Sequence, residues 1–410
     1  MNSCDCVVVG GGPAGSSCAR ALVQAGLDVI VLDKSKFPRD KVCAGWITPA
    51  VIDELEIDLA EYRQGRTLQP FTGFRTGLLG SSQIETRYDH VVSYGIRRCE
   101  FDQFLLERSG AKLQLGLPLA ELRREMSQWI VNNSVRTPLI IGAGGHFCPV
   151  ARLMARERGD ESTIVFAQEA EFEMSAAEAA ACRIAPETPE LFFCKDLRGY
   201  AWCVRKESFL NIGLGREADR NLSAHLVAFL ESLQEQGRLP RGIRPRFRGH
   251  AYRLYSGDLR RVVADGVLLI GDAAGLACVQ SGEGIRPAIE SGLMAAQEIV
   301  AVKGDYRRDQ LGNFPRRLEA RFGCPSKASR HGFPFERLRS ALARRLLSTR
   351  WFTRRVVLDR WFLRANQAPL PLPGHALDDR ERLAGQRSPG KGRPRGLREL
   401  FIVWRHRQAR

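Results

Sequence analysis

The sequence predicts an α/β fold into which an antiparallel β-sheet is inserted, followed by a basic helical region. Three observations predict it. The chain opens with an apolar strand, a glycine-rich turn and a helix, and another strand, glycine-rich loop and helix follow near residue 270. Between them lie alternating apolar and polar residues that are typical of antiparallel strands. With 410 residues, the chain is long enough for two domains.

The first glycine-rich segment, Gly10–Gly15, follows the apolar strand Cys6–Val9. Gly10 permits a sharp turn, Gly12 lets the backbone approach a pyrophosphate, and Gly15 lets the following helix pack closely on the strand. That helix, expected over residues 16–25, offers free N–H groups and its positive dipole end to phosphates. The segment therefore predicts a dinucleotide-binding turn, although glycine turns also serve plain strand–helix connections.

A second strand, residues 27–32, ends at Asp33. In dinucleotide-binding folds, an acid about twenty residues beyond the glycines accepts hydrogen bonds from ribose hydroxyls. Asp33 therefore strengthens the prediction of a bound dinucleotide, but it does not distinguish FAD from NAD.

The late segment favours FAD. A buried strand, residues 267–270, delivers Asp272 at its carboxyl end, where ligands lie in open α/β sheets. An aspartate there can accept a hydrogen bond from a ribityl hydroxyl, and NAD has no ribityl chain. Gly282 and Gly284 precede a helix expected over 285–301, whose first N–H groups suit the pyrimidine edge of a flavin. The alternative is a strand, a loop and a helix that hold no ligand.

Composition bears on the cellular context. The sequence has no run of eighteen or more apolar residues, and its start lacks the regions of a secretory signal. Its eleven cysteines are scattered without a CxxC pair. We therefore expect reduced thiols in a cytoplasmic protein, with no zinc or iron–sulfur centre.

The positive charge is concentrated at the C-terminal end. Residues 316–410 contain 24 Lys or Arg against 7 Asp or Glu, a net of +17, which leaves −1 for residues 1–315. Residues 342–363 mix apolar side chains with six arginines: Arg344, Arg345, Arg350, Arg354, Arg355 and Arg360. This pattern predicts either an amphipathic helix on an anionic membrane surface or a helix packed on its own substrate domain with a solvated basic face.

The chain after residue 369 is rich in Pro, Gly and Arg, and we expect it to be partly disordered. We expect no nucleic-acid partner, because no recognition motif accompanies the charge.

The predicted domains are discontinuous in the sequence. Strand-like runs at 166–172, 191–194, 201–205 and 209–213 interrupt the nucleotide-binding pattern. We assign residues 1–70, 93–160 and 256–315 to an FAD-binding domain, and residues 71–92 and 161–255 to a substrate-binding domain. Residues 316–368 form a C-terminal helical region, and 369–410 form the tail. Arg98 opens a helix that reaches about residue 109, and it is suited to contact the phosphate or ribityl part of the cofactor.

Further segments carry a family resemblance. They are the two glycine-rich segments, Arg98–Asp102, the run Tyr200-Ala201-Trp202-Cys203-Val204 and the later Gly213-Leu214-Gly215. With these residues the chain resembles the geranylgeranyl reductase family, within the FAD-dependent hydroxylase-like superfamily, over roughly residues 5–320. The resemblance implies an FAD-binding, Rossmann-like domain of the glutathione-reductase type with an inserted antiparallel substrate domain. It also implies that Tyr200 and Trp202 line a prenyl-substrate cavity and that Cys43 lies on a loop near the flavin.

The sequence departs from the family in several places. Gly144 stands where relatives carry an acid that supports the cofactor region, and His146 or Arg152 would have to compensate. Val204 replaces an aromatic residue, and Val279 replaces a proline. We find no second domain for NADPH, so the expected electron donor is transiently bound NAD(P)H or reduced ferredoxin.

We expect FAD to be bound non-covalently, because the motifs supply phosphate, ribose and ribityl contacts and no flavin-linking residue is marked. The expected cofactor-binding residues are Gly10, Gly12, Pro13, Ala14, Gly15, Asp33, Lys34, Arg39, Lys41, Arg98, Gly271, Asp272, Gly282, Gly284 and Ile285.

The expected catalytic residues are Cys43, Tyr200 and Trp202. Tyr200 and Trp202 are two residues apart on a strand and so share a face, where they would wall a substrate tunnel or pack as ordinary core aromatics. Cys43 would be a proton relay or an inert thiol.

Three functions remain open at this point. The first is reduction of isoprenoid C=C bonds by hydride transfer from reduced flavin. The second is an FAD-dependent monooxygenase, or less favourably a halogenase, acting on an aromatic or secondary-metabolite substrate. The third is a flavin-containing protein whose main work is binding a membrane surface through its basic end.

Overall fold

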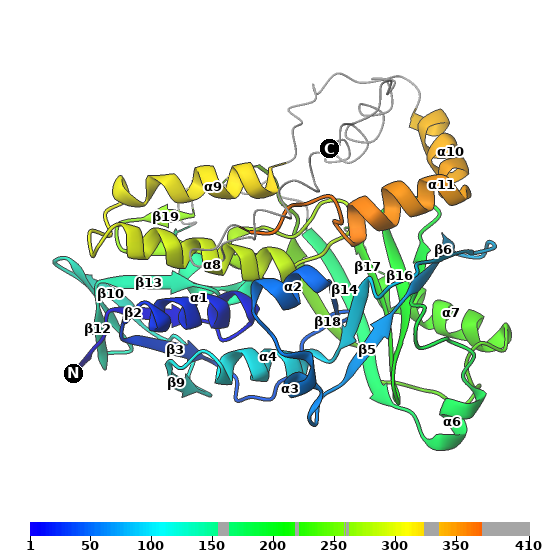
Figure 1. Ribbon diagram of the computed structural model, residues 1–410, viewed down its shortest axis with the longest axis horizontal. Coiled ribbons are helices and arrows are strands. Elements are labelled where there is room, and N and C mark those ends of the chain that lie inside the picture. Colours follow the sequence, from blue (N-terminus) through cyan, green and yellow to red (C-terminus); the bar gives the residue numbers. More distant parts are fainter. Residues whose placement is uncertain (155–163, 218–220, 258, 260–261, 324–335, 371–410) are drawn as a thin grey trace.

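The computed structural model describes residues 1–154, 164–217, 221–257, 259, 262–323 and 336–370. Figure 1 shows two β-sheets that lie side by side and whose strands run in steeply different directions. One half of the molecule holds β2, β3 and β13 with helices α1, α8 and α9. The other holds the long strands β14, β16 and β17, with α6 and α7 at its outer side. The predicted α/β fold with an inserted, largely antiparallel sheet is confirmed.

The first sheet has six strands in the order β19-β20-β13-β2-β3-β9, and all neighbours are parallel except β19 and β20. The strands are β2 (Cys6–Val9), β3 (Val29–Asp33), β9 (Lys112–Leu115), β13 (Leu139–Gly142), β19 (Val263–Ala264) and β20 (Val267–Leu269). Every residue of β2, β3, β13 and β20 is buried, in one apolar core that these strands share with the neighbouring helices and the small four-stranded sheet. The carboxyl ends of these parallel strands meet at one edge, which brings Gly10, Asp33 and Gly271 together.

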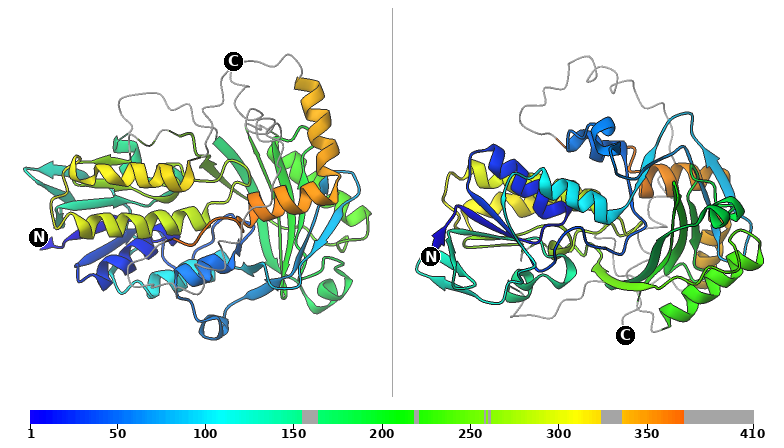
Figure 2. Two further views of the ribbon diagram at one scale, coloured as in Figure 1. Left: turned by 45° about the horizontal axis from the view of Figure 1, so that its top comes forward. Right: turned by 90° about the horizontal axis from the view of Figure 1, so that it is seen from below.

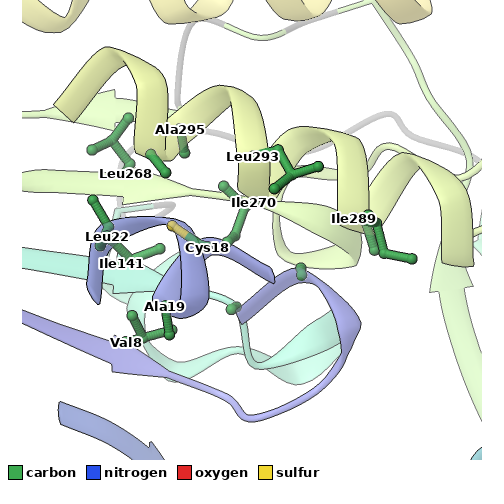
Figure 3. Close-up of a cluster of buried hydrophobic side chains, with 14 of the residues drawn as sticks. Val8, Cys18, Ala19, Leu22, Ile141, Leu268, Ile270, Ile289, Leu293 and Ala295 are labelled. Atoms are coloured by element: carbon green, nitrogen blue, oxygen red, sulfur yellow. The ribbon is translucent and has the colours of Figure 1, made fainter. Parts of the chain in front are cut away.

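Two helices cross closely over this sheet: α1 (Pro13–Gln24) and α8 (Ile285–Ala301). Glycine makes the close crossing possible, since a Cβ on Gly292 would lie 2.4 Å from the carbonyl oxygen of Ala14. Figure 3 shows the apolar side chains between the helices and the sheet, including Cys18 and Leu22 of α1 and Ile289 of α8. Burial of this layer fixes the start of both helices at the same sheet edge.

The second sheet has seven strands in the order β18-β14-β17-β16-β15-β6-β7. They are β6 (Gly73–Leu78), β7 (Ile84–Arg87), β14 (Ile164–Glu173), β15 (Glu190–Phe193), β16 (Gly199–Lys206), β17 (Phe209–Glu217) and β18 (Arg248–Arg253). All neighbours are antiparallel except β6 and β15. The hairpin β6–β7 therefore joins strands that lie about a hundred residues later in the chain.

Side chains alternate between the faces of this sheet, as the strand period requires. Ala201 and Cys203 pack against helix α7 (Leu222–Glu235), whereas Trp202 and Val204 face the opposite side. Figure 2 shows α7 in green and the C-terminal helices in orange on opposite faces of the sheet. The C-terminal helices thus cover the face of the seven-stranded sheet that lies opposite α7.

The C-terminal region comprises α9 (Asn313–Phe322), α10 (Glu336–Leu347), α11 (Arg350–Phe352) and a π-helix, η4 (Thr353–Phe362). In the last two elements the buried side chains recur every five residues, at Phe352, Val357 and Phe362. This spacing matches the i→i+5 hydrogen bonds of a π-helix, and the amide of Leu363 donates to the carbonyl of Leu358 at 2.8 Å.

The orientation of this region bears on the two alternatives left open by the sequence. The buried apolar residues of α10, α11 and η4 pack on the seven-stranded sheet, whereas those of α9 pack in the core of the first sheet, and all six arginines between residues 344 and 360 are exposed. No helix among the described residues is both long and apolar enough to cross a membrane. The tail that we expect to be partly disordered lies, from residue 371 on, outside the described residues.

Smaller elements complete the fold. A four-stranded sheet contains β1 (Asn2–Ser3), β12 (Val135–Thr137), β11 (Gln128–Val131) and β10 (Leu122–Glu125), and a three-stranded sheet contains β4 (Trp46–Ile47), β8 (Ser93–Ile96) and β5 (Leu68–Phe71). The remaining helices are α2 (Pro49–Glu54), α3 (Leu59–Arg63), α4 (Arg98–Glu107), α5 (Pro149–Met154) and α6 (Ala176–Ala181).

Candidate functional site

A cavity of about 510 Å³ is lined by residues of both sheets and of the C-terminal region. Its wall contains all of the predicted site residues except Gly15 and Gly271. Those that line it are Gly10, Gly12, Pro13, Ala14, Asp33, Lys34, Arg39, Lys41, Cys43, Arg98, Tyr200, Trp202, Asp272, Gly282, Gly284 and Ile285. The fold thus brings together residues that are up to 275 positions apart in the chain, from Gly10 to Ile285. Their individual roles stay predictions.

The glycine turn presents backbone to the cavity. Gly10 has a φ of +116°, and a Cβ there would lie 2.4 Å from the carbonyl oxygen of Ala143, so no other residue fits. Gly12 is the N-cap of α1, and neither a capping side chain nor an acidic residue occupies the first turn. The first N–H groups of α1 are therefore available to an anion in the cavity.

Gly15 and Gly271 lie one layer behind the cavity wall. A Cβ on Gly15 would approach the carbonyl oxygen of Gly10 to 1.9 Å, and one on Gly271 would lie 3.0 Å from the Cβ of Ala14. Both glycines therefore allow neighbouring elements to pack closely, and this packing positions the glycine turn. Neither glycine faces the cavity itself.

Asp33 is held in position by the backbone. Its Oδ2 accepts a hydrogen bond from the amide of Gly11 at 2.7 Å, and its Oδ1 accepts one from the amide of Ser35 at 2.8 Å. Each carboxylate oxygen has a further lone pair, so the group can still accept hydrogen bonds from a ribose in the cavity. Asp33 thus also ties the glycine turn to the end of β3.

Cations gather in the next part of the cavity. Arg98 makes a two-point ion pair with the buried Asp102, at 2.8 Å for each bond, and Arg39 contacts the same carboxylate at 3.3 Å. Lys41 contacts His250 through Nζ and Nε2. Desolvation lowers the pKa of Lys41 to about 8, and the nearby Arg98 adds to that shift. Arginine and lysine in this arrangement suit a pyrophosphate.

The predicted replacement of the missing acid can also be located. Gly144 lines the cavity, and both His146 and Arg152 line it as well.

Desolvation, with further contributions from Lys41, Arg98 and His146, lowers the pKa of His250 to about 3, so the ring of His250 is neutral. A histidine that the sequence did not single out therefore contacts Lys41 without adding a charge.

The late glycine segment forms the opposite wall. Asp272 belongs to a short 3₁₀-helix, η2 (Gly271–Ala274), and a Cβ on Gly284 would lie 3.2 Å from its Oδ1. Gly282 has a φ of +69°, and a Cβ there would lie 2.4 Å from the hydroxyl of Tyr252. Gly284 is the N-cap of α8, again without a capping side chain. The backbone N–H groups at the start of α8 therefore face the cavity, as expected for a flavin edge.

Aromatic residues close the far end of the cavity. The rings of Tyr200 and Trp202 lie 6.0 Å apart, and that of Phe362 lies 5.3 Å from Tyr200. Trp46, 6.2 Å from Phe362, also lines the cavity. The hydroxyl of Tyr200 donates to the carbonyl of Ser281 at 2.6 Å, which joins the aromatic wall to the segment before α8. The polar atom of Tyr200 is thus satisfied, and its ring offers an apolar surface.

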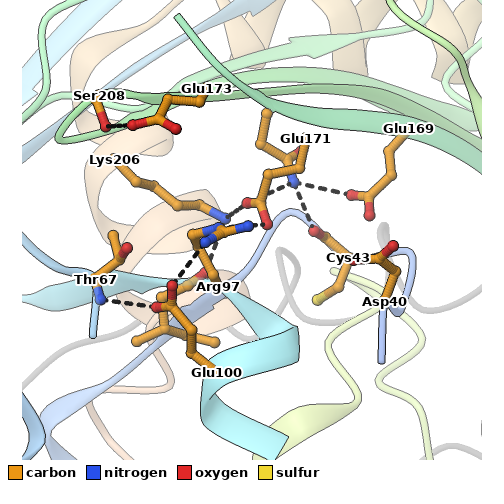
Figure 4. A network of polar contacts seen from close by, with 12 residues as sticks. Asp40, Cys43, Thr67, Arg97, Glu100, Glu169, Glu171, Glu173, Lys206 and Ser208 are labelled. Atoms are coloured by element: carbon orange, nitrogen blue, oxygen red, sulfur yellow. Dashed lines mark hydrogen bonds and ion pairs between the residues drawn. The ribbon is translucent and has the colours of Figure 1, made fainter. Parts of the chain in front are cut away.

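A polar network lies behind this wall (Figure 4). Asn211 accepts a hydrogen bond from the indole of Trp202 at 2.7 Å and donates to the carbonyl of Cys43 at 3.0 Å. It also contacts Glu169 and Glu171, and Glu171 pairs with Lys206 at 2.7 Å. Desolvation raises the pKa of Glu169 to about 7, against the charge of Lys206. The network consists of buried polar residues on adjacent strands. Because they are far apart in the sequence, they can be recognised as a group only when the pairing of the strands is known.

Comparison with known proteins identifies the class of enzyme. The family described as FAD dependent oxidoreductase matches residues 5–89, the part of the chain that contains the glycine turn and Asp33. Menaquinone reductase of Mycobacterium tuberculosis is 29% identical over 352 residues, covering 78% of this chain and 81% of that protein. Digeranylgeranylglycerophospholipid reductase of Methanocaldococcus jannaschii is 26% identical over 333 residues, covering 76% and 81%.

The crystal structure of a geranylgeranyl bacteriochlorophyll reductase-like protein from Thermoplasma acidophilum has the same fold. It superimposes with a TM-score of 0.67 at 22% sequence identity, over 85% of this chain and 88% of the other. The chain is an FAD-dependent oxidoreductase, and the proteins that it is similar to include ones named as reductases of geranylgeranyl compounds.

The cavity of this oxidoreductase fits FAD in three respects. Two helix N-termini without capping side chains face it, glycines stand where a Cβ would enter the backbone or a neighbouring side chain, and Arg39, Lys41 and Arg98 line its middle. The predicted cofactor is thus confirmed. Within the described residues no group of His, Cys, Asp and Glu side chains is arranged to hold a metal ion.

The sequence missed several cavity residues of the oxidoreductase. His250 and Tyr252 come from β18, and Phe362 comes from the C-terminal region. They carry no motif, and only the pairing of β18 with β14 and the packing of the π-helix bring them to the site.

Proposed function

We propose that this oxidoreductase reduces C=C bonds in an isoprenoid chain of the geranylgeranyl type. The observation that carries the proposal is the aromatic end of the cavity, where Tyr200, Trp202 and Phe362 adjoin the loop of Cys43 and the segment before α8. An alkene without polar substituents offers no hydrogen-bonding handle, so its reaction depends on positioning by apolar walls. Such a substrate agrees with the similarity to the relative from Methanocaldococcus jannaschii, a digeranylgeranylglycerophospholipid reductase.

Bound FAD, once reduced, supplies a hydride to one alkene carbon, and the neighbouring carbon takes a proton. In our proposal Tyr200 and Trp202 hold the chain against the cofactor and exclude water. The thiol of Cys43, which accepts a hydrogen bond from the amide of Gly45 at 3.4 Å, delivers the proton and is reprotonated from solvent. The products are the saturated CH–CH bond and oxidised FAD. A reduced nicotinamide nucleotide or reduced ferredoxin then returns FAD to its reduced form.

We also propose that the enzyme works at the cytoplasmic surface of an anionic membrane. The six arginines between residues 344 and 360 are exposed, and the side chain of Trp351 is 64% exposed. Basic residues beside an exposed tryptophan suit the headgroup layer of a bilayer. The substrate would then reach the cavity from the membrane rather than through water.

A single-turnover experiment tests the reaction. Holoenzyme reduced with dithionite is mixed without oxygen with a geranylgeranyl phospholipid in detergent, flavin absorbance is followed, and the lipid is analysed by mass spectrometry. We expect reoxidation of the flavin and a gain of two hydrogens per saturated bond. A product that forms only in air and contains added oxygen or halogen would overturn the proposal in favour of a monooxygenase or halogenase.

Cys43→Ala provides the test of the proton step. We expect it to slow reoxidation by the lipid roughly a hundred- to ten-thousandfold, the range of general acid catalysis, with FAD content unchanged. The matched control is Cys99→Ala, since Cys99 has similar partial exposure but does not line the cavity. Equal rates in the two variants would assign Cys43 a packing role.

A further inference from the structure

The side-chain amide of Asn211 joins two walls of the cavity that come from different parts of the fold. Its Oδ1 accepts from the indole N–H of Trp202, on β16, at 2.7 Å, and its Nδ2 donates to the carbonyl of Cys43, on the loop after β3, at 3.0 Å. Asn211 itself is only 1% exposed and does not line the cavity. It therefore lies behind both residues that the proposed function places at the reacting end.

We propose that Asn211 is a positioning residue that fixes the indole of Trp202 and the Cys43 loop relative to each other. This inference rests on the proposed function for the importance of the two residues, but the geometry that it describes does not depend on the substrate. Asn211 acts through Trp202 and the backbone of Cys43 and touches neither the proposed substrate nor the cofactor.

Only an amide satisfies all the contacts at this position. Trp202 is a donor, whereas the carbonyl of Cys43 and the carboxylates of Glu169 and Glu171, at 3.0 and 3.2 Å, are acceptors. An asparagine offers one acceptor atom, which takes the indole N–H, and two N–H donors, which the three acceptors share. Ionised aspartate would accept from Trp202 but could not donate to Cys43, and leucine could do neither.

The indole is fixed from a second side by a glycine. A Cβ on Gly213 would lie 2.2 Å from Cζ2 of Trp202, so the ring occupies the space that a side chain would otherwise fill. Gly213 sets where the ring lies, and Asn211 sets the direction of its N–H group. At the second glycine of that run, Gly215, a Cβ would keep ordinary contact distances of 3.7 Å or more, so Gly213 is the constrained one.

The network behind Asn211 is anchored on the FAD-binding side. Lys206, fully buried, pairs with Glu171 and donates to the carbonyl of Ile96 on β8 at 2.9 Å. Arg97, which follows β8, also contacts Glu171 at 3.6 Å. Asn211 is thus held by groups from both parts of the molecule. Without its side chain, the link between Trp202 and the Cys43 loop is lost, and each is free to move without the other.

The first test needs no substrate. Holoenzyme labelled with 5-fluorotryptophan is studied by ¹⁹F NMR, and Trp202→Phe assigns the resonance of Trp202. We expect Asn211→Leu and Asn211→Asp to shift or broaden this resonance while FAD content stays unchanged. The matched control is Gln234→Leu, because Gln234 is another buried amide of the same domain, with three carbonyl acceptors around its Nε2. An unmoved Trp202 resonance in both Asn211 variants would overturn the proposal.

The second test measures the consequence for turnover. We expect Asn211→Leu to lower the maximal rate of flavin reoxidation by lipid about ten- to a hundredfold, with a smaller change in KM, and Gln234→Leu to leave it near wild type. In the Trp202→Phe background, Asn211→Leu should cost much less, because the indole partner is already gone. Asn211→Asp should recover part of the rate as the pH is lowered and its carboxyl gains a proton to donate.

The two tests separate failure of this proposal from failure of the proposed function. A holoenzyme that does not reduce the lipid contradicts the function and leaves the NMR result to decide the role of Asn211. Full additivity of Asn211→Leu and Trp202→Phe, in an enzyme that does reduce the lipid, contradicts positioning through Trp202.

Discussion

Lys41 shows how the surroundings of a single residue set its charge. It lies among Arg39, Arg98 and the neutral His250, and desolvation lowers its pKa to about 8. A phosphate in the cavity would reverse the effect, because an opposite charge favours the protonated form. Binding of a pyrophosphate and protonation of Lys41 are therefore linked.

We predict that the affinity of the apoprotein for FAD falls as the pH rises above about 8. Below that pH Lys41 is protonated before FAD binds, so affinity is constant; above it, binding must take up a proton, and Kd rises by up to about tenfold per pH unit. Fluorescence titration of FAD between pH 6.5 and 9.5 measures this change.

Lys41→Met should bind FAD more weakly at pH 7 and lose most of the pH dependence. Lys36→Met is the control, since Lys36 is an exposed lysine of the same loop that does not line the cavity. A steep pH dependence that persists in Lys41→Met would assign the titration to another group.

Among the elements, the C-terminal π-helix explains why residues 342–363 were ambiguous in the sequence. They were expected to form an amphipathic helix that lies either on a membrane or on the protein itself, and from Thr353 to Phe362 the chain forms a π-helix instead. With a spacing of five, Phe352, Val357 and Phe362 align on the buried side, and the arginines fall outside. Packing on the sheet and a basic outer surface are therefore properties of the same segment.

We predict that charge reversal at Arg344, Arg345 and Arg350 weakens binding to anionic vesicles at least tenfold. Each basic residue near such a surface contributes about 1 kcal/mol. These three are exposed, whereas Arg354 stacks on Tyr88 at 4.9 Å and Arg355 pairs with Asp359 at 3.6 Å, so changing either would also disturb the fold. Co-sedimentation at increasing ionic strength gives the measurement.

The control carries the same change of charge elsewhere: Arg183→Glu, Arg241→Glu and Arg246→Glu, at exposed positions near α6 and α7. Equal loss of vesicle binding in both triple variants would indicate a general effect of net charge, and no loss in the first would refute membrane docking by this surface.

How well an element was predicted depended on whether its ends are chemically constrained. Gly10 and Gly12 precede α1, and Gly284 precedes α8, which begins at Ile285 as expected. The helix α1 starts at Pro13 rather than Ser16, because Gly12 is its N-cap and proline fits a first turn. The helix α7 and the strands β10 to β12 escaped prediction, since burial on a distant partner rather than a local motif defines them.

The same distinction applies to the site. Residues that touch the nucleotide region, such as Asp33 and Asp272, follow short motifs and could be named from the sequence. Asn211, His250 and Phe362 depend on strand pairing and on the packing of the last helices, so no local pattern reveals them.

At the scale of the whole molecule, the cavity is a junction. Its wall draws on both sheets and on the C-terminal region, with Phe362 packed against Tyr200 and Arg321 of α9 donating to the carbonyl of Ala368 at 2.8 Å. A ligand that fills this junction binds the folded chain and not the unfolded one, so it stabilises the fold as a whole.

We predict that FAD is held without a covalent bond and stabilises the protein by mass action. Acid precipitation should release all of the yellow colour into the supernatant. Free FAD at about a hundred times its Kd should raise the free energy of unfolding of the apoprotein by about 2.7 kcal/mol, measured by urea denaturation. Colour retained in the pellet would point to Cys43 or a histidine of the cavity as a linking residue.

The position of Phe362 in the chain has a consequence for biosynthesis. A ribosome completes the residues proposed to hold FAD, from Gly10 to Ile285, well before it adds the segment that carries Phe362. Because chains fold progressively as they emerge, the nucleotide half can take shape while the aromatic wall is still missing. The site proposed for FAD can therefore form before the aromatic wall that would hold the substrate chain is complete.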